Sequence, residues 1–148
     1  MEPVEVVESL YSAWERSDWD QLAELIDDAA VFSAPRTPDV GKFALIAGMK
    51  RRKAAFGDLE FELADMKAVG DEVTFGMTWT GTNTGVVEMP VPGFDPIQPT
   101  GVSVTESQHV SLRVSGDKVV DGYGDRSVDE SRRCILEQLG VVFNAPPF

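Results

Sequence analysis

Cysteine and histidine are nearly missing from the sequence, and this limits the metal and redox chemistry that we expect of it. Cys134 and His109 are the single residues of their types in 148. One cysteine cannot form an intrachain disulfide, and the scattered carboxylates lack the spacing of metal ligands. We therefore expect no disulfide within the chain and no bound metal.

Positive charge is also scarce. The chain has 13 lysines and arginines against 25 aspartates and glutamates, which gives a net charge of −12. Such a chain repels phosphate backbones and anionic lipid, so we expect neither a nucleic-acid partner nor a membrane partner. The one basic cluster, residues 50–53, falls in an expected helix, and we interpret it as a solvated helix face.

Long apolar runs are lacking too. No run approaches the ~20 residues needed to span a bilayer. The first eleven residues are acidic and amphipathic, unlike a secretory leader, so we expect a cytoplasmic protein. The length, with 43% apolar residues, predicts one domain over 1–148 with a sizeable core.

The spacing of apolar residues changes along the chain from helical to strand-like. Helical spacing and capping signals predict helices over about 3–16, 18–26, 41–56 and 127–140. Alternating residues predict a short strand at 30–32 and longer strands near 59–64, 73–80, 102–114 and 118–125. Residues 34–38 are interpreted as a breaker and 85–100 as a loop. Helices followed by antiparallel hairpins predict an α+β fold with a curved sheet, whose helix-covered concave face holds a ligand.

Six segments, in chain order, resemble motifs of the SnoaL-like polyketide cyclases of the nuclear transport factor 2-like superfamily. They are residues 7–22, 56–61, 79–85, 99–101, 118–123 and 137–140. The resemblance implies a cone-shaped α+β barrel: a strongly curved, mostly antiparallel sheet with N-terminal helices packed on its concave face. It also implies that the protein uses no cofactor and forms a homodimer or a higher homo-oligomer.

Characterised cyclases of this family close a ring by intramolecular aldol condensation, with an aspartate as acid and base. The resemblance therefore suggests a cofactor-free acid/base enzyme, of cyclase or isomerase type, that acts on a hydrophobic polyketide-like carbonyl compound. The alternative is a non-catalytic small-molecule binding module of the same fold. A third hypothesis, an epoxide hydrolase relative, needs an Asp-Arg-Asp cluster. Regular strand spacing places Arg113 on the wrong face to join Asp121.

The strand near 118–125 carries the catalytic candidates. Regular alternation places Asp121, Tyr123 and Asp125 on the same face as Val119, which we expect to point inward. Two carboxylates near a phenol could move a proton next to a ketone, and Gln108 on the preceding strand could orient the substrate. Alternatively, Asp125 ends its strand at a solvated edge or caps the next helix, and Asp121 is a surface carboxylate.

Other residues are candidates for binding the substrate. Glu106 shares the inward face of Gln108, and these two polar groups either bind substrate or bond to each other and to water. His109 has the opposite orientation unless a bulge reverses it. Large side chains and a strand-end amide give further candidates: Trp14, Phe32, Trp79, Met89 and Asn83. Core packing is the commoner explanation for each of the large side chains, and a turn explains Asn83 equally well.

Overall fold

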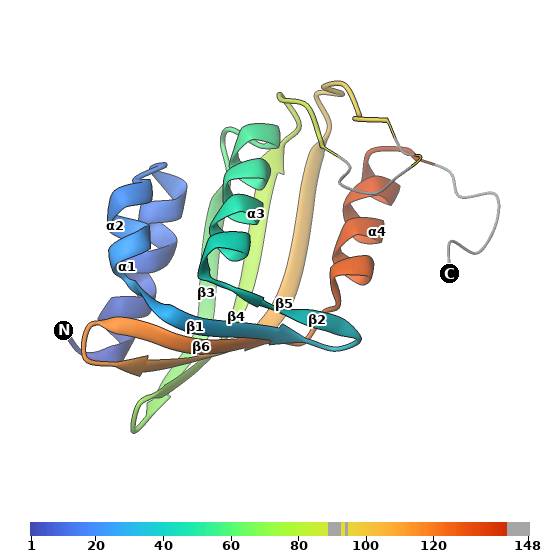
Figure 1. The fold of residues 1–148 in the computed structure, drawn as a ribbon. Coiled ribbons are helices and arrows are strands. Elements are labelled where there is room, and N and C mark those ends of the chain that lie inside the picture. Colours follow the sequence, from blue (N-terminus) through green and yellow to red (C-terminus); the bar gives the residue numbers. More distant parts are fainter. Residues whose placement is uncertain (89–92, 94, 142–148) are drawn as a thin grey trace.

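A computed structural model describes residues 1–88, 93 and 95–141 of the chain. In this part of the chain the strands form one curved, open sheet of six strands, and the helices lie against its concave side (Figure 1). The predicted α+β fold with a curved, mostly antiparallel sheet is confirmed. Within the described residues, no helix is long and apolar enough to cross a membrane.

Four helices appear near their predicted positions, and local capping explains where two of them begin. The Asp18 side chain accepts a hydrogen bond from the backbone N–H of Gln21 at 3.2 Å, which caps α2. Ser127 forms a reciprocal capping box with Glu130 at the start of α4. The helices are α1 (Pro3–Glu15), α2 (Trp19–Glu24), α3 (Lys42–Ala55) and α4 (Val128–Gln138).

The sheet has the order β2-β1-β6-β5-β4-β3. Neighbouring strands are antiparallel except β1 and β6, which are parallel and join the N-terminal part of the sheet to its C-terminal part. The strands are β1 (Ile26–Ala34), β2 (Thr37–Gly41), β3 (Glu60–Val69), β4 (Glu72–Thr82), β5 (Ser103–Ser115) and β6 (Lys118–Gly124).

The predicted breaker at 34–38 is wrong in part, because β2 begins inside it. The structure has a strand of nine residues at β1, longer than the predicted 30–32, followed by a turn in which Arg36 has φ 50°. Pro38 lies within β2, at the outer edge of the sheet. Proline is tolerated there because an edge strand leaves half of its amide groups without a partner strand.

An aromatic cluster fixes α1 and α3 over the sheet. The rings of Tyr11 and Trp14 lie 4.9 and 4.6 Å from the ring of Phe61 on β3. The Trp14 indole nitrogen Nε1 donates a hydrogen bond to the Met49 carbonyl oxygen on α3, at 3.1 Å. The cluster therefore positions the inner face of α3 above the concave side of the sheet.

A bulge in β6 reverses the predicted orientation of its second half. Val119 pairs with Val114 of β5, but the next pair joins Asp121 to Arg113, which leaves Val120 as an extra residue. Between these two pairs β6 has one residue more than β5. The alternation of side chains along β6 therefore shifts by one residue after the bulge.

Glycine contacts show which way the strand turns after the bulge. A Cβ atom at Gly122 would lie 2.6 Å from Leu112 Cδ2 and 2.8 Å from Phe32 Cδ1, among side chains of the inner face. A Cβ atom at Gly124 would lie 2.8 Å from Gln108 Oε1. The glycines thus face inward, and the residues between and beside them face the outer surface.

Candidate functional site

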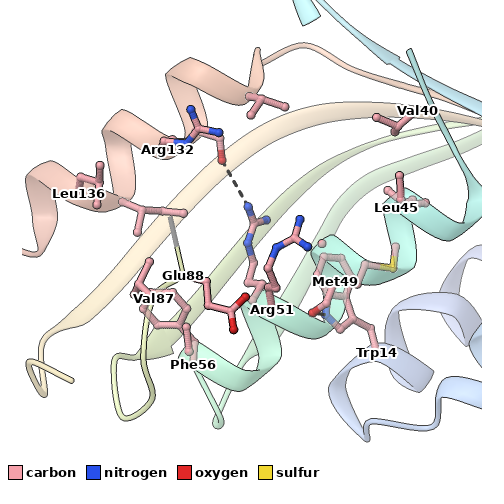
Figure 2. Close-up of a pocket in the computed structure, with 17 residues that line it drawn as sticks. Trp14, Val40, Leu45, Met49, Arg51, Phe56, Val87, Glu88, Arg132 and Leu136 are labelled. Carbon is pink, nitrogen blue, oxygen red and sulfur yellow. Dashed lines mark hydrogen bonds between the residues drawn. The ribbon is translucent and has the colours of Figure 1, made fainter. Parts of the chain in front are cut away.

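A cavity of about 370 Å³ lies between α3 and α4 on the concave side of the sheet (Figure 2). Its position follows from the two helical faces, because α3 and α4 each turn apolar side chains toward the other. The apolar lining residues are Trp14, Val40, Ala44, Leu45, Met49, Ala55, Phe56, Val87, Val128, Ile135 and Leu136. Such a lining suits a ligand with a flat or branched apolar body.

Five polar residues also line this cavity. Arg51 and Arg52 come from α3, Ser131 and Arg132 from α4, and Glu88 from the segment after β4. The Arg52 guanidinium lies over the ring of Trp79, with Cζ 5.1 Å from the ring centroid. Burial lowers the pKa of Arg52, although the guanidinium stays protonated at neutral pH.

Glu106 lies directly behind the cavity wall and connects to it through Ser131. The Glu106 side chain has 0% exposure, and its Oε1 accepts hydrogen bonds from Trp79 Nε1 at 2.8 Å and from Ser131 Oγ at 2.9 Å. Ser131 Oγ also lies 3.5 Å from an Arg52 nitrogen. A buried carboxylate, a hydroxyl and a guanidinium thus form one continuous chain that ends in the cavity.

The second carboxylate oxygen of Glu106 is buried without a hydrogen-bond donor among the described residues. The nearest cationic atom is Arg126 Nε, at 3.5 Å from Oε2, and this nitrogen is also buried without a hydrogen-bond acceptor. Glu106 is therefore flanked by two guanidinium groups, those of Arg52 and Arg126. A buried charge needs such partners, and its free oxygen keeps an acceptor site available.

A comparison with protein families matches residues 4–124 to the model of SnoaL-like polyketide cyclase. The chain belongs to the SnoaL-like polyketide cyclase family. The resemblance found in the sequence motifs is thus confirmed. No curated protein gives a significant match.

Solved structures agree with this family fold. AclR, a proposed hydroxylase from Streptomyces galilaeus, is 25% identical with a TM-score of 0.77, over 99% of this chain and 85% of that one. IdmH, a proposed polyketide cyclase from Streptomyces antibioticus, is 23% identical with a TM-score of 0.74, over 95% and 100%. An epoxide hydrolase of the LEH-like type from M. tuberculosis is 16% identical with a TM-score of 0.66, over 94% and 92%.

In this member of the family, Asp121 and Tyr123 do not point into the cavity, so their predicted orientation is wrong. The Asp121 side chain is 44% exposed and accepts a hydrogen bond from Arg113 Nε at 2.8 Å on the outer face. Tyr123 is 47% exposed. The cause is the bulge at Val120, which turns both residues away from the helices. It also places Asp121 on the same face as Arg113, so the prediction that these two lie on opposite faces is wrong.

Asp125 lies on the same outer side, so its predicted inward orientation is wrong as well. Its Oδ1 accepts a hydrogen bond from the His109 backbone amide at 2.8 Å, and its side chain is 48% exposed. The His109 side chain is 82% exposed, as the spacing of β5 predicts. The alternative in which Asp125 ends its strand at a solvated edge therefore fits its position.

The inward residues of β5 lie where the spacing predicts. Glu106 is buried and Gln108 is half-buried, with its amide oxygen beside Gly124. Of the predicted aromatic residues, Trp14 lines the cavity and Trp79 lies under Arg52. Phe32 is half-buried beside Gly122, outside the lining, and Met89 lies outside the described residues.

Asn83 holds the end of β4 in place and has no free hydrogen-bonding group for a ligand. Its Nδ2 donates to the carbonyl oxygens of Ala55 and Gly85, at 3.2 and 2.8 Å. Its Oδ1 accepts from the amide and the hydroxyl of Thr100, at 2.9 and 2.8 Å. The turn role considered for Asn83 therefore describes it better than a position at the cavity mouth.

The sequence analysis predicts none of the five polar residues that line the cavity, although helical spacing gives a signal for two of them, Arg52 and Ser131. The prediction of a solvated face over residues 50–53 is wrong for Arg52, which lies three residues after Met49 and four before Phe56, on the inner side of α3. Ser131 lies four residues before Ile135, on the inner side of α4. Helical spacing alone places both residues on the inner face. They were not predicted there because polar residues usually lie on the solvent face of a helix.

The described residues contain no group of three or more His, Cys, Asp or Glu side chains placed to hold a metal ion. The ionisable groups at the cavity are instead three arginines, the exposed carboxylate of Glu88 and, behind the wall, the buried carboxylate of Glu106. This set suits proton transfer and the binding of a polar oxygen.

Proposed function

We propose that the protein is a cofactor-free acid/base enzyme, of cyclase or isomerase type, that acts on a hydrophobic carbonyl compound in the cavity between α3 and α4. The observation that carries the proposal is the hydrogen bond from Ser131 Oγ to buried Glu106, because it links a carboxylate to the cavity. Trp14 and the apolar lining would hold the body of the substrate.

The proton would move through Ser131. A substrate C–H bond next to one or two carbonyl groups breaks, and its proton passes to Ser131 Oγ while the serine proton passes to Glu106 Oε1. The electron pair of the C–H bond enters the substrate as an enolate. The Arg52 guanidinium, fixed by Trp79, would stabilise the negative enolate oxygen.

The same relay run in reverse completes either reaction. In an isomerase the proton returns to a different atom of the substrate. In a cyclase the enolate carbon attacks a second carbonyl of the same molecule, and the resulting alkoxide takes the proton through Ser131 from Glu106. Carboxylate, hydroxyl and guanidinium are regenerated unchanged, so no external oxidant or co-reactant is needed.

A binding module of the same fold is the second candidate. It is favoured by the depth of Glu106, which meets the cavity through one hydroxyl, and by the outward position of Asp121 and Asp125. In that case Glu106 is only the partner of Arg52 and Arg126, and the cavity holds its ligand without chemistry.

The test is hydrogen–deuterium exchange at the carbon next to the carbonyl of 2-tetralone, a bicyclic ketone, followed by NMR in D₂O. General acid/base groups contribute about 10²–10⁴-fold to rate, so Glu106→Gln and Ser131→Ala should each slow the protein-catalysed exchange by at least about tenfold. Glu62→Gln, on an exposed position of β3, is the control for a lost carboxylate.

The outcomes separate the candidates. Binding of the ketone without any exchange supports the binding module. A loss of exchange in the variant Asp121→Asn or Asp125→Asn, with Glu106→Gln unchanged, would overturn the proposed relay. It would show instead that a carboxylate of the outer face is the acid/base group. Circular dichroism of each variant shows whether a loss of activity is merely a loss of fold.

A further inference from the structure

The cavity concentrates positive charge in a strongly acidic chain. The net charge is −12, with 13 basic residues in total, yet three arginines line this one cavity: Arg51, Arg52 and Arg132. Glu88 is the one acidic residue among the lining residues described. Arg52 and Arg132 are half-buried at the cavity, whereas Arg51 is exposed to water at its wall.

The three arginines differ in how far other groups neutralise them. Arg132 lies 3.3 Å from Asp129 Oδ1 on the same helix, so its charge is partly paired. Arg52 contacts the Trp79 ring and the Ser131 hydroxyl, which are neutral, while Glu106 lies behind them. Its pKa is lowered by burial against the opposing influence of Glu106, so this guanidinium is incompletely compensated.

Arg51 is the exposed arginine of the three. Within the part of the chain that the structure describes, no carboxylate forms an ion pair with it. Its guanidinium folds back along α3, where Nη2 would lie 3.7 Å from a Cβ atom at Gly48. Figure 2 shows Arg51 beside Met49, at the wall of the cavity.

We propose that the ligand of this cavity carries a carboxylate on its apolar body, and that Arg51 is the residue that selects it. A planar guanidinium matches the two oxygens of a carboxylate and forms two charge-assisted hydrogen bonds with them. The apolar walls from α3 and α4 take the rest of the ligand.

This inference rests on the proposed function only in using the same cavity, and it adds the class of substrate: a free acid rather than a neutral ester or amide. Arg52 remains available for the oxygen on which charge develops. Arg51 would thus bind the permanent charge of the ligand carboxylate, and Arg52 would stabilise the charge formed in the reaction.

The experiment compares two probes of nearly the same shape, 2-naphthoate and 2-naphthamide, by isothermal titration calorimetry with the full chain. We expect 2-naphthoate to bind at least about tenfold more tightly than 2-naphthamide. Arg51→Gln should remove most of this preference by weakening the acid about tenfold, while the affinity for the amide stays unchanged.

Lys50→Gln is the matched control, because it removes the same charge from the neighbouring position of α3, where Lys50 contacts Trp19 instead of the cavity. Equal affinities for acid and amide overturn the proposal, as does failure of 2-naphthoate to bind. An equal loss in Lys50→Gln and Arg51→Gln also overturns it, since the preference is then a long-range effect of charge.

The result is independent of the acid/base step. Exchange on 2-tetralone needs no carboxylate on the substrate, whereas the calorimetry needs no turnover. Normal exchange together with equal affinities would overturn the carboxylate site and leave the proposed function supported. No exchange together with a clear preference for 2-naphthoate would overturn the proposed function and support the carboxylate site.

Discussion

Asp58 is a single residue whose charge ties the turn before β3 to the end of β4. Its two carboxylate oxygens accept hydrogen bonds from the Thr82 amide at 2.6 Å and from the Thr82 hydroxyl at 2.8 Å. These bonds, that from the amide first, lower the pKa of the Asp58 carboxyl. They favour the ionised form, so the link depends on pH.

We predict that Asp58→Ala lowers the free energy of unfolding at neutral pH by about 0.5–1 kcal/mol, a value reduced because the site is exposed to solvent. The folded-state pKa is depressed, so the contribution is present above the ordinary aspartate value of ~3.9 and is lost as the pH falls through the folded value. Chemical denaturation at several pH values measures this.

A difference between wild type and Asp58→Ala that persists unchanged at strongly acidic pH would contradict the argument. Thr82→Val, which removes the donating hydroxyl and keeps the donating amide, should show a smaller effect with the same pH dependence.

At the scale of the element, the bulge in β6 decides which side chains meet the helices. Gly122 permits this arrangement, because Leu112 and Phe32 occupy the space beside its Cα atom. Gly124, two residues later on the same inner face, has only the flexible end of Gln108 beside it. The two glycines therefore offer a direct comparison within one strand.

We predict that Gly122→Ala destabilises the fold by about 1–3 kcal/mol, because the new methyl group overpacks the core beside a ring that cannot move away freely. Gly124→Ala should cost clearly less, since the Gln108 side chain can rotate. The measurement is the midpoint of thermal unfolding of both variants. Equal midpoints, both close to wild type, would show that the strand is not oriented as described.

At the scale of the whole molecule, the outer face of the sheet is open, and we propose that a second copy of the chain covers part of it. Val31 on β1 and Tyr123 on β6 are 43% and 47% exposed on neighbouring strands, among mostly polar residues. Exposed apolar groups on an open sheet face favour such an interface.

We predict that the wild-type chain sediments as a homodimer and that Tyr123→Asp shifts it to a monomer, because the interface would then bury an unpaired charge. Phe43→Asp on α3, at a position that is 79% exposed, is the control and should leave the dimer intact. Sedimentation velocity measures the mass. A wild-type monomer at high protein concentration would reject the proposal.

The single domain over 1–148 and the cytoplasmic location stay predictions.

What the sequence determined by itself is the local periodicity. Alternation along β5 placed Glu106 and Gln108 inward and His109 outward, and helical spacing with the caps at Asp18 and Ser127 located the helices. These features depend on neighbours a few residues away, so one strand or helix contains the information that fixes them. The family motifs, spread over the chain, indicated the curved sheet.

The tertiary structure alone decided the orientation of the second half of β6 and the chemistry of the cavity. The bulge at Val120 arises from pairing with β5, a strand whose register no local pattern in β6 records. Arg52 turns inward because Trp79 and Glu106, on two strands distant in sequence, provide a ring and a counter-charge beneath it. A polar residue on an inner face is stable only with such partners, and folding brings them together.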